Sequence, residues 1–128
     1  TGRGWARIID MLLKRQFHWQ RKHAHAELFL NDECVGEVEL RGLNTSWSFG
    51  EFKPNDAFAK YAPIFGNWSL LMHEETDGKL HDAAADELRA VEVAIDRLHA
   101  KLHFPKTDKW QRAAQLNIDG SLIEWKQY

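Results

Sequence analysis

Residues 24–40 read AHAELFLNDECVGEVEL, and the alternation in this stretch decides the class of fold. Apolar side chains recur at nearly every second position on both sides of a polar centre, which is the period of a half-buried β-strand. The central residues 31–33, Asn-Asp-Glu, are typical of a turn. We therefore predict a β-hairpin whose three-residue loop pairs Leu30 with Cys34.

A second hairpin is predicted near the C-terminus, over residues 114–125, AQLNIDGSLIEW. Apolar and polar residues alternate on both sides of Asp119-Gly120, a dipeptide that favours a two-residue type I′ turn. With that turn Ile118 faces Ser121, and the apolar residues of both strands share one face. The register and the hydrophobic pattern therefore agree.

The segment between the hairpins predicts one more strand and the helices. Residues 47–54, WSFGEFKP, indicate a Trp-rich strand, in which Gly50 marks a bulge or a close backbone approach. Helical spacing follows over 56–74, where Pro63 predicts a kink or two short helices. A long helix is predicted over 80–103 because its apolar residues recur at steps of four and three, at Ala84, Leu88, Val91, Ile95, Leu98 and Leu102.

These elements predict one α+β domain over residues 1–128. Its sheet is largely antiparallel, with about five strands (two hairpins plus the Trp-rich strand) packed against two or three helices. Residues 1–23 are predicted to form a peripheral N-terminal helix and a basic segment. Residues 1–10 are given little functional weight, because the sequence starts without methionine and Met11 is an alternative first residue.

Composition narrows the classes of function. Hydrophobic residues make up 44% and charged residues 28% of the 128, which is typical of a folded domain. The net charge of −2 gives no overall field that attracts nucleic acid. Cys34 is the single cysteine, so no intramolecular disulfide can form and a cytoplasmic location is predicted. Apolar runs are far shorter than the roughly 20 residues of a membrane-spanning helix, so no membrane partner is expected.

Several short patterns of this sequence recur together in other proteins. They are Trp47, Gly50, Phe52 and Pro54 in the Trp-rich strand, Val35-Gly36-Glu37 before it, and Ile118-Asp119-Gly120 with Trp125 after it. With these patterns the chain resembles a set of small uncharacterised bacterial proteins over about residues 26–128, and the shared elements are structural. The resemblance implies a bacterial origin and an unassigned function, with no catalytic residue to carry over.

The seven histidines are the strongest candidates in this chain for metal ligands or catalytic residues. His23 and His25 would share one face of a strand, and His99 and His103 would lie one turn apart on the long helix, where Asp96 could add a carboxylate. These five residues define the hypothesis of a divalent-metal-binding protein or hydrolase. No other cofactor is predicted. Against the hypothesis, mixed polar residues are also what any solvated helix face displays.

Two further hypotheses rest on basic and aromatic side chains. The basic segment suggests a single-stranded nucleic-acid-binding accessory protein, although the overall charge argues against it. The hypothesis we favour is a non-enzymatic protein–protein interaction module, with an unknown protein partner or a homodimer, because no motif specific to a reaction is found. Trp19 and Trp110 are its candidate exposed contacts, and the basic candidates are Lys14, Arg15, Arg21 and Lys22.

Overall fold

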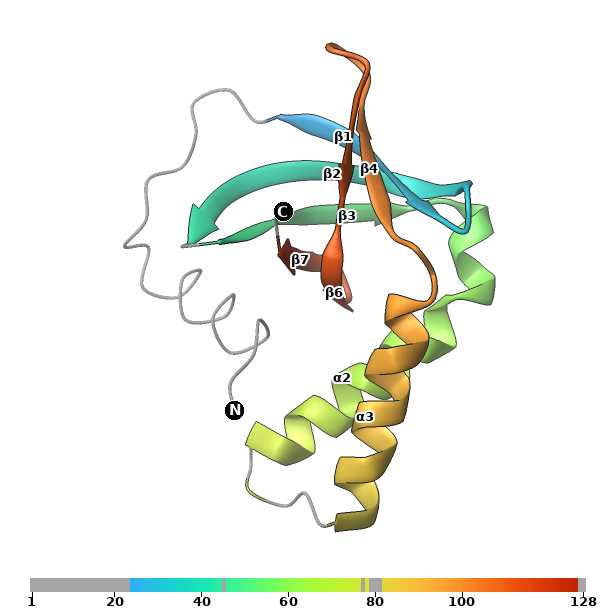
Figure 1. Cartoon of the computed structure of the whole chain (residues 1–128), viewed down its shortest axis with the longest axis vertical. Coiled ribbons are helices and arrows are strands. Elements are labelled where there is room, and N and C mark those ends of the chain that lie inside the picture. The colour runs from blue at the N-terminus through green and yellow to red at the C-terminus, as the bar shows by residue number, and fades with distance from the viewer. Residues whose placement is uncertain (1–23, 45, 77, 79–81, 127–128) are drawn as a thin grey trace.

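The computed structural model describes residues 24–44, 46–76, 78 and 82–126. Seven strands form one antiparallel sheet in the order β5-β4-β1-β2-β3-β7-β6, and two α-helices and a 3-10 helix accompany it (Figure 1). The α+β class is confirmed, and the predicted count of five strands is corrected to seven. The elements are β1 (His25–Leu30), β2 (Glu33–Asn44), β3 (Trp47–Pro54), η1 (Asp56–Lys60), α2 (Ala62–Thr76), α3 (Asp82–Asp96), β4 (Lys101–Phe104), β5 (Lys109–Arg112), β6 (Ala114–Asp119) and β7 (Leu122–Lys126).

The sheet is strongly curled, and its topology explains why. β5 and β6 stand at opposite ends of the strand order, yet only Ala113 separates them along the chain. Figure 1 shows β5 running directly into β6. The Ala113 N–H donates to the carbonyl of Ala100 at 3.0 Å, which ties this junction to the start of β4. One continuous stretch of chain therefore forms both ends of the sheet.

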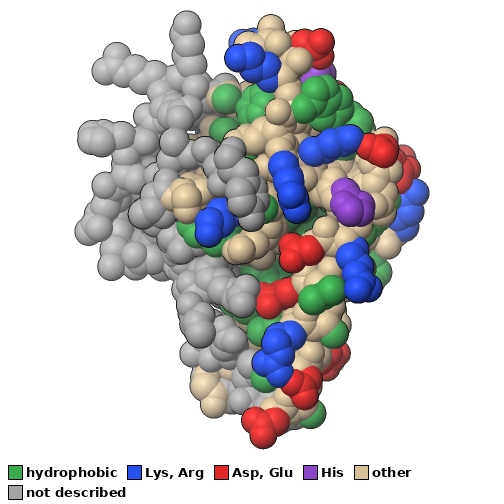
Figure 2. Space-filling view, viewed as in Figure 1, with side chains coloured by type: hydrophobic (Ala, Val, Ile, Leu, Met, Phe, Trp, Pro, Cys, Tyr) green, Lys and Arg blue, Asp and Glu red, His purple; other side chains and the backbone are tan. Residues whose placement is uncertain are grey.

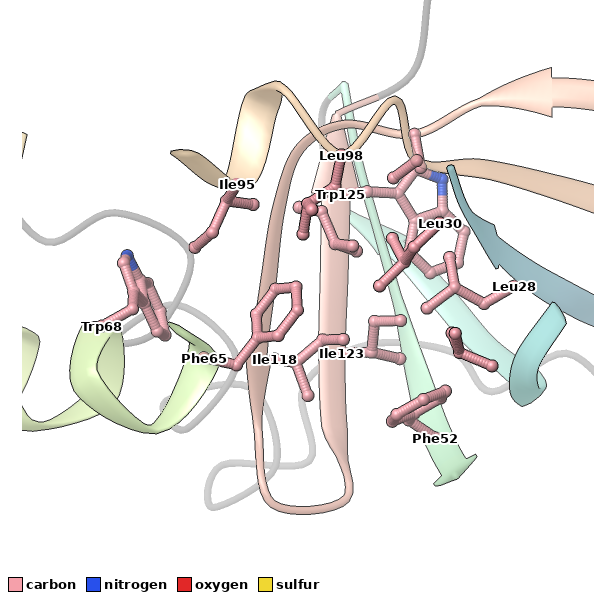
Figure 3. Packing of buried hydrophobic residues seen from close by; sticks show 14 of the residues in the cluster. Leu28, Leu30, Phe52, Phe65, Trp68, Ile95, Leu98, Ile118, Ile123 and Trp125 are labelled. Atoms are coloured by element: carbon pink, nitrogen blue, oxygen red, sulfur yellow. The ribbon is translucent and has the colours of Figure 1, made fainter. Parts of the chain in front are cut away.

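The hydrophobic core lies between the sheet and the two helices. Ala26, Leu28 and Leu30 alternate along β1 and are fully buried, as the period of two predicts. Phe65 and Trp68 of α2 point toward the same interior (Figure 3). α2 and α3 pack against each other, and both contact β6. Side chains from the helices and from most strands thus share one core.

The first hairpin has a tighter turn than predicted. The pairing of Leu30 with Cys34 is wrong, because Leu30 pairs with Glu33. Asn31 and Asp32 alone form the turn, and both take the left-handed conformation, with φ of 51° and 65°. Asn and Asp tolerate this conformation better than other non-glycine residues, which is why a two-residue turn fits here. A register shift farther along the hairpin restores the rest of the predicted pairing.

The C-terminal hairpin is present with a different register. The predicted pairing of Ile118 with Ser121 is wrong, because Ile118 pairs with Ile123. The turn consists of Gly120 and Ser121, with Gly120 in the left-handed conformation at φ 62°. The register has moved by two residues, so Ile118 and Ile123 still face the core.

The long helix is shorter than predicted. The range 80–103 is wrong at its C-terminal end, because α3 stops at Asp96. His99 has a φ of 51°, a left-handed conformation that cannot continue a helix. Leu98 and Leu102 are nevertheless buried, one in the turn and the other on β4. Leu98 and Leu102 happen to continue the helical spacing of apolar residues beyond the end of α3. The sequence therefore predicted helix where β4 lies, and β4 and β5 were missed.

Of the kink or two short helices predicted over 56–74, the structure has two separate helices, the short η1 and the longer α2 of 15 residues. Asn55 caps the first of them, since its side-chain oxygen accepts a hydrogen bond from the Ala57 N–H at 2.9 Å. Within the described residues, no helix is both long enough and apolar enough to cross a membrane. The predicted N-terminal helix and basic segment, residues 1–23, lie outside the described residues.

Candidate functional site

A compact group of polar and aromatic side chains lies on the outer face of β1, β4 and β5. Leu28 pairs with Leu102, and both are fully buried, so the residues on either side of them face outward. The ladder places outward residues of the three strands opposite one another, His103 facing Trp110 across β4 and β5. We call this group the Trp110 patch, and it consists of Glu27, Phe29, Lys101, His103 and Trp110.

Trp110 is the exposed centre of the patch. Its side chain is 52% exposed although it belongs to a regular strand. Three neighbours hold the indole: the Phe29 ring at 5.0 Å between centroids, the His103 ring at 4.5 Å, and the Lys101 Nζ at 5.0 Å from the ring centroid. Aromatic and cation–π contacts of this kind restrict the ring without covering it. Trp110 thus offers apolar surface in a fixed orientation.

His103 ties the patch together electrostatically. Its Nδ1 lies 3.0 Å from Glu27 Oε1, and its Nε2 lies 2.8 Å from Asp108 Oδ1. The hydrogen bond with Glu27, followed by that with Asp108, raises the pKa of His103 above its ordinary value. When protonated, His103 donates to both carboxylates, which links β1 to the turn between β4 and β5. Both ring nitrogens are therefore occupied.

The β4–β5 hairpin carries an excess of positive charge. Lys101 pairs with Asp32 in the β1–β2 turn, and this hydrogen bond lowers the pKa of Asp32. Figure 2 shows cationic, acidic, histidine and hydrophobic side chains side by side at the end of the molecule where this hairpin projects. Against the single acid Asp108, residues 101–112 contain four cations, Lys101, Lys106, Lys109 and Arg112.

Comparison with known proteins does not identify a relative of this chain. No protein family, curated protein or solved structure matches this chain. The Trp110 patch combines an exposed indole, an imidazole between two carboxylates and a cation-rich strand pair.

The structure separates the residues that the metal hypothesis places on one helix. His99 lies in the turn after α3, and His103 lies on β4, so the predicted spacing of one helical turn is wrong. Asp96 ends α3 and lines a small cavity together with His99. His103 instead belongs to the Trp110 patch. The helix break thus divides the predicted ligands between two sites.

The other predicted site residues fall in two groups. His25 lies on β1, where its Nε2 is 3.2 Å from Glu37 Oε1. Among the residues that the structure describes, no three His, Cys, Asp or Glu side chains form a group suited to a metal ion. The remaining candidates lie outside the described residues: His23 for the metal, Trp19 for protein contact, and Lys14, Arg15, Arg21 and Lys22 for nucleic acid.

Trp110 and His103 could each be singled out from the sequence, but Phe29 and Lys101 beside them could not. Phe29 and Lys101 are opposite each other in the β1–β4 ladder, a pairing between positions 72 residues apart that no local pattern reveals. A usable signal did exist in residues 101–112, where two short alternating runs flank Pro105 and three polar residues. Interpreting that stretch as a hairpin would have placed His103 and Trp110 together.

Proposed function

We propose that this domain is a protein-binding module that uses the Trp110 patch as its contact surface. The observation that carries the proposal is the half-exposed indole held by Phe29, His103 and Lys101. Large aromatic side chains dominate the energy of protein interfaces, and a side chain that is already ordered loses little entropy on binding. A surface of this kind fits a protein partner.

The position of Trp110 on β5 suggests how the partner binds. β5 is the last strand of the sheet order, so its outer edge pairs with no other described strand. An extended segment can add to such an edge through main-chain hydrogen bonds, with alternate side chains reaching the pockets beside it. The cations along residues 101–112 favour an acidic segment. The expected ligand is an acidic, extended stretch of another protein.

The same observations favour a protein over single-stranded nucleic acid. Stacking of nucleobases requires an open aromatic face. Lys101 lies over the Trp110 ring, and the His103 ring lies against it with an interplanar angle of 37°. These neighbours leave less of the ring face open to a stacking base.

Selection from a random peptide library on the immobilised full chain tests the proposal. We expect enrichment of acidic peptides rich in β-branched and aromatic residues. Trp110→Ala should raise the Kd of a selected peptide roughly thirty-fold, the loss of about 2 kcal/mol that marks a hot spot. Leu70→Ala is the matched control, because Leu70 is 69% exposed on α2 and lies outside the patch. Titration calorimetry measures both variants.

Either of two results would contradict the proposed function. The first is a set of selected peptides whose Kd is the same for the native protein and Trp110→Ala. The second is binding of a labelled thymidine oligonucleotide that depends on Trp110 and weakens steeply with salt, which would assign the patch to nucleic acid. Thermal unfolding of each variant separates lost binding from lost folding.

A further inference from the structure

Lys101 places an ammonium group beside the exposed indole of the Trp110 patch. It lies on β4, opposite Phe29 of β1 in the strand ladder. Its Nζ reaches toward β5, where it lies 5.0 Å from the centroid of the Trp110 ring. A strand added to the outer edge of β5 would lie roughly 4.8 Å farther out, a gap that a glutamate side chain can bridge. An acidic segment bound beside Trp110 can therefore reach this ammonium.

In the free protein the Lys101 ammonium already holds a carboxylate of the same chain. Its Nζ donates to Oδ1 of Asp32, a residue of the β1–β2 turn that is 69 positions away in the sequence. The hydrogen bond with Lys101 and the charge of Lys101 lower the pKa of Asp32, so this carboxyl is ionised at neutral pH. The Asp32 side chain is 83% exposed. The pair thus reproduces within one chain the contact that an acidic ligand would make.

The turn that carries Asp32 is held by contacts other than this ion pair. The Asn31 N–H donates to the Leu98 carbonyl at 2.8 Å, and Leu30 pairs with Glu33 across the turn. Ion pairs between exposed side chains contribute little to stability, because water screens the charges and both side chains lose rotamer freedom. Release of Lys101 from Asp32 therefore costs the fold little.

A carboxylate of the ligand and the carboxylate of Asp32 compete for the same ammonium. A lysine that is neutralised by an aspartate attracts an acidic segment less strongly than a lysine without such a partner. We propose that Asp32 is an internal competitor of the ligand: it pairs with Lys101 in the free protein and is replaced by a carboxylate of the bound segment. This role of Asp32 rests on the proposed function, because the ligand is the acidic segment at the Trp110 patch.

The sign of one substitution distinguishes a competitor from a residue that positions Lys101 for the ligand. Asp32→Asn keeps the side-chain shape and removes the neutralising charge, so it should lower the Kd of an acidic peptide selected on the native chain roughly threefold to tenfold. A positioning role would raise this Kd instead, and a gain of affinity cannot come from misfolding. Asp86→Asn is the matched control, because Asp86 forms an exposed ion pair with Arg89 on α3. It removes the same charge and should leave the Kd unchanged.

A double-mutant cycle tests whether Asp32 acts through Lys101. Lys101→Met removes the ammonium and keeps the apolar stem of the side chain beside Trp110. We expect it to raise the Kd of the same peptide several-fold, and we expect Asp32→Asn to give no gain of affinity in the Lys101→Met background. An equal gain in both backgrounds would show that Asp32 acts through the overall charge and would overturn the proposal.

A series of peptides identifies the carboxylate that replaces Asp32. Each peptide has one acidic residue changed to the corresponding amide, and titration calorimetry measures its Kd for the native protein and for Asp32→Asn. We expect one position at which the amide abolishes the gain of affinity from Asp32→Asn. A gain that persists at every position would contradict the replacement of Asp32 by the ligand.

The outcomes separate this role of Asp32 from the proposed function. An unchanged or higher Kd in Asp32→Asn, for a peptide whose binding depends on Trp110, would overturn the competitor role and leave the proposed function intact. Selected peptides that bind equally well to Trp110→Ala would overturn both. Thermal unfolding shows whether each variant is folded.

Discussion

His103 makes the stability of the sheet depend on pH near neutrality. Glu27 and Asp108 raise its pKa in the folded protein above the ordinary value of 6.5. Folding therefore favours the protonated form, and its stabilisation is complete below the unfolded-state pKa and is lost as the pH rises through the folded-state pKa. The affected window lies above about pH 6.5.

This sign predicts the outcome of a thermal unfolding experiment. We expect the unfolding temperature to fall as the pH rises above about 6.5, the ordinary pKa of a histidine, and we expect His103→Gln to flatten that fall. Glu27→Gln should flatten it in part, because the bond to Asp108 remains. His73→Gln, a substitution of an exposed histidine on α2, is the control. A native pH dependence in His103→Gln would assign the effect to other groups.

At the scale of elements, replacing each of two glycines with alanine should change the free energy of unfolding in opposite directions. A Cβ on Gly50 of β3 would lie 2.3 Å from the Glu39 carbonyl oxygen, which confirms the close backbone approach predicted for this strand. Gly50→Ala should lower the free energy of unfolding by about 2 kcal/mol or more, because backbone must move.

Gly66 of α2 is the control position, where the same change from glycine to alanine should have the opposite effect. A Cβ there meets nothing within 4 Å. Gly66→Ala should raise the free energy of unfolding by about 0.5–1 kcal/mol, since alanine is the better helix former. Urea denaturation measures both variants. Similar losses from the two substitutions would contradict the packing at the β2–β3 contact.

The elements also show how far sequence patterns reach. The period of two located both hairpins, because burial of one face repeats locally along a strand. Turn geometry was less certain, since Asp119-Gly120 and Gly120-Ser121 both place glycine where a turn needs it. The apolar spacing that defined α3 continued through Leu98 and Leu102, and it concealed β4. Local periodicity thus predicts that an element exists better than where it ends.

At the scale of the whole molecule, the pairing of strands that are distant along the chain could not be predicted from the sequence. Glu27 pairs with His103, and Trp47 pairs with Lys126, so strands that are far apart along the chain are neighbours in the sheet. These contacts depend on the curl of the whole sheet. The Trp110 patch arises from such contacts, which is why only individual residues of it could be named in advance.

The topology predicts the behaviour of a shortened chain. β4 pairs with the outer edge of β1, and β7 pairs with the outer edge of β3. A chain that stops at Ala100 retains β1, β2 and β3 but exposes both edges, and exposed edges promote aggregation. We expect such a chain to aggregate and a peptide of residues 101–126, added in trans, to reduce the aggregation. Light scattering measures both, and a monomeric shortened chain would contradict the prediction.

The single stretch that forms both ends of the sheet also sets an order of events during synthesis. The ribosome makes residues 101–126 after β1, β2 and β3, and this last stretch holds the pairing partners for both edges of the three strands. At about 5–20 residues per second, its synthesis takes roughly one to five seconds. Throughout that interval the nascent chain has two strand edges awaiting their partners, so the speed of translation just after residue 100 governs how long it is exposed to misassembly.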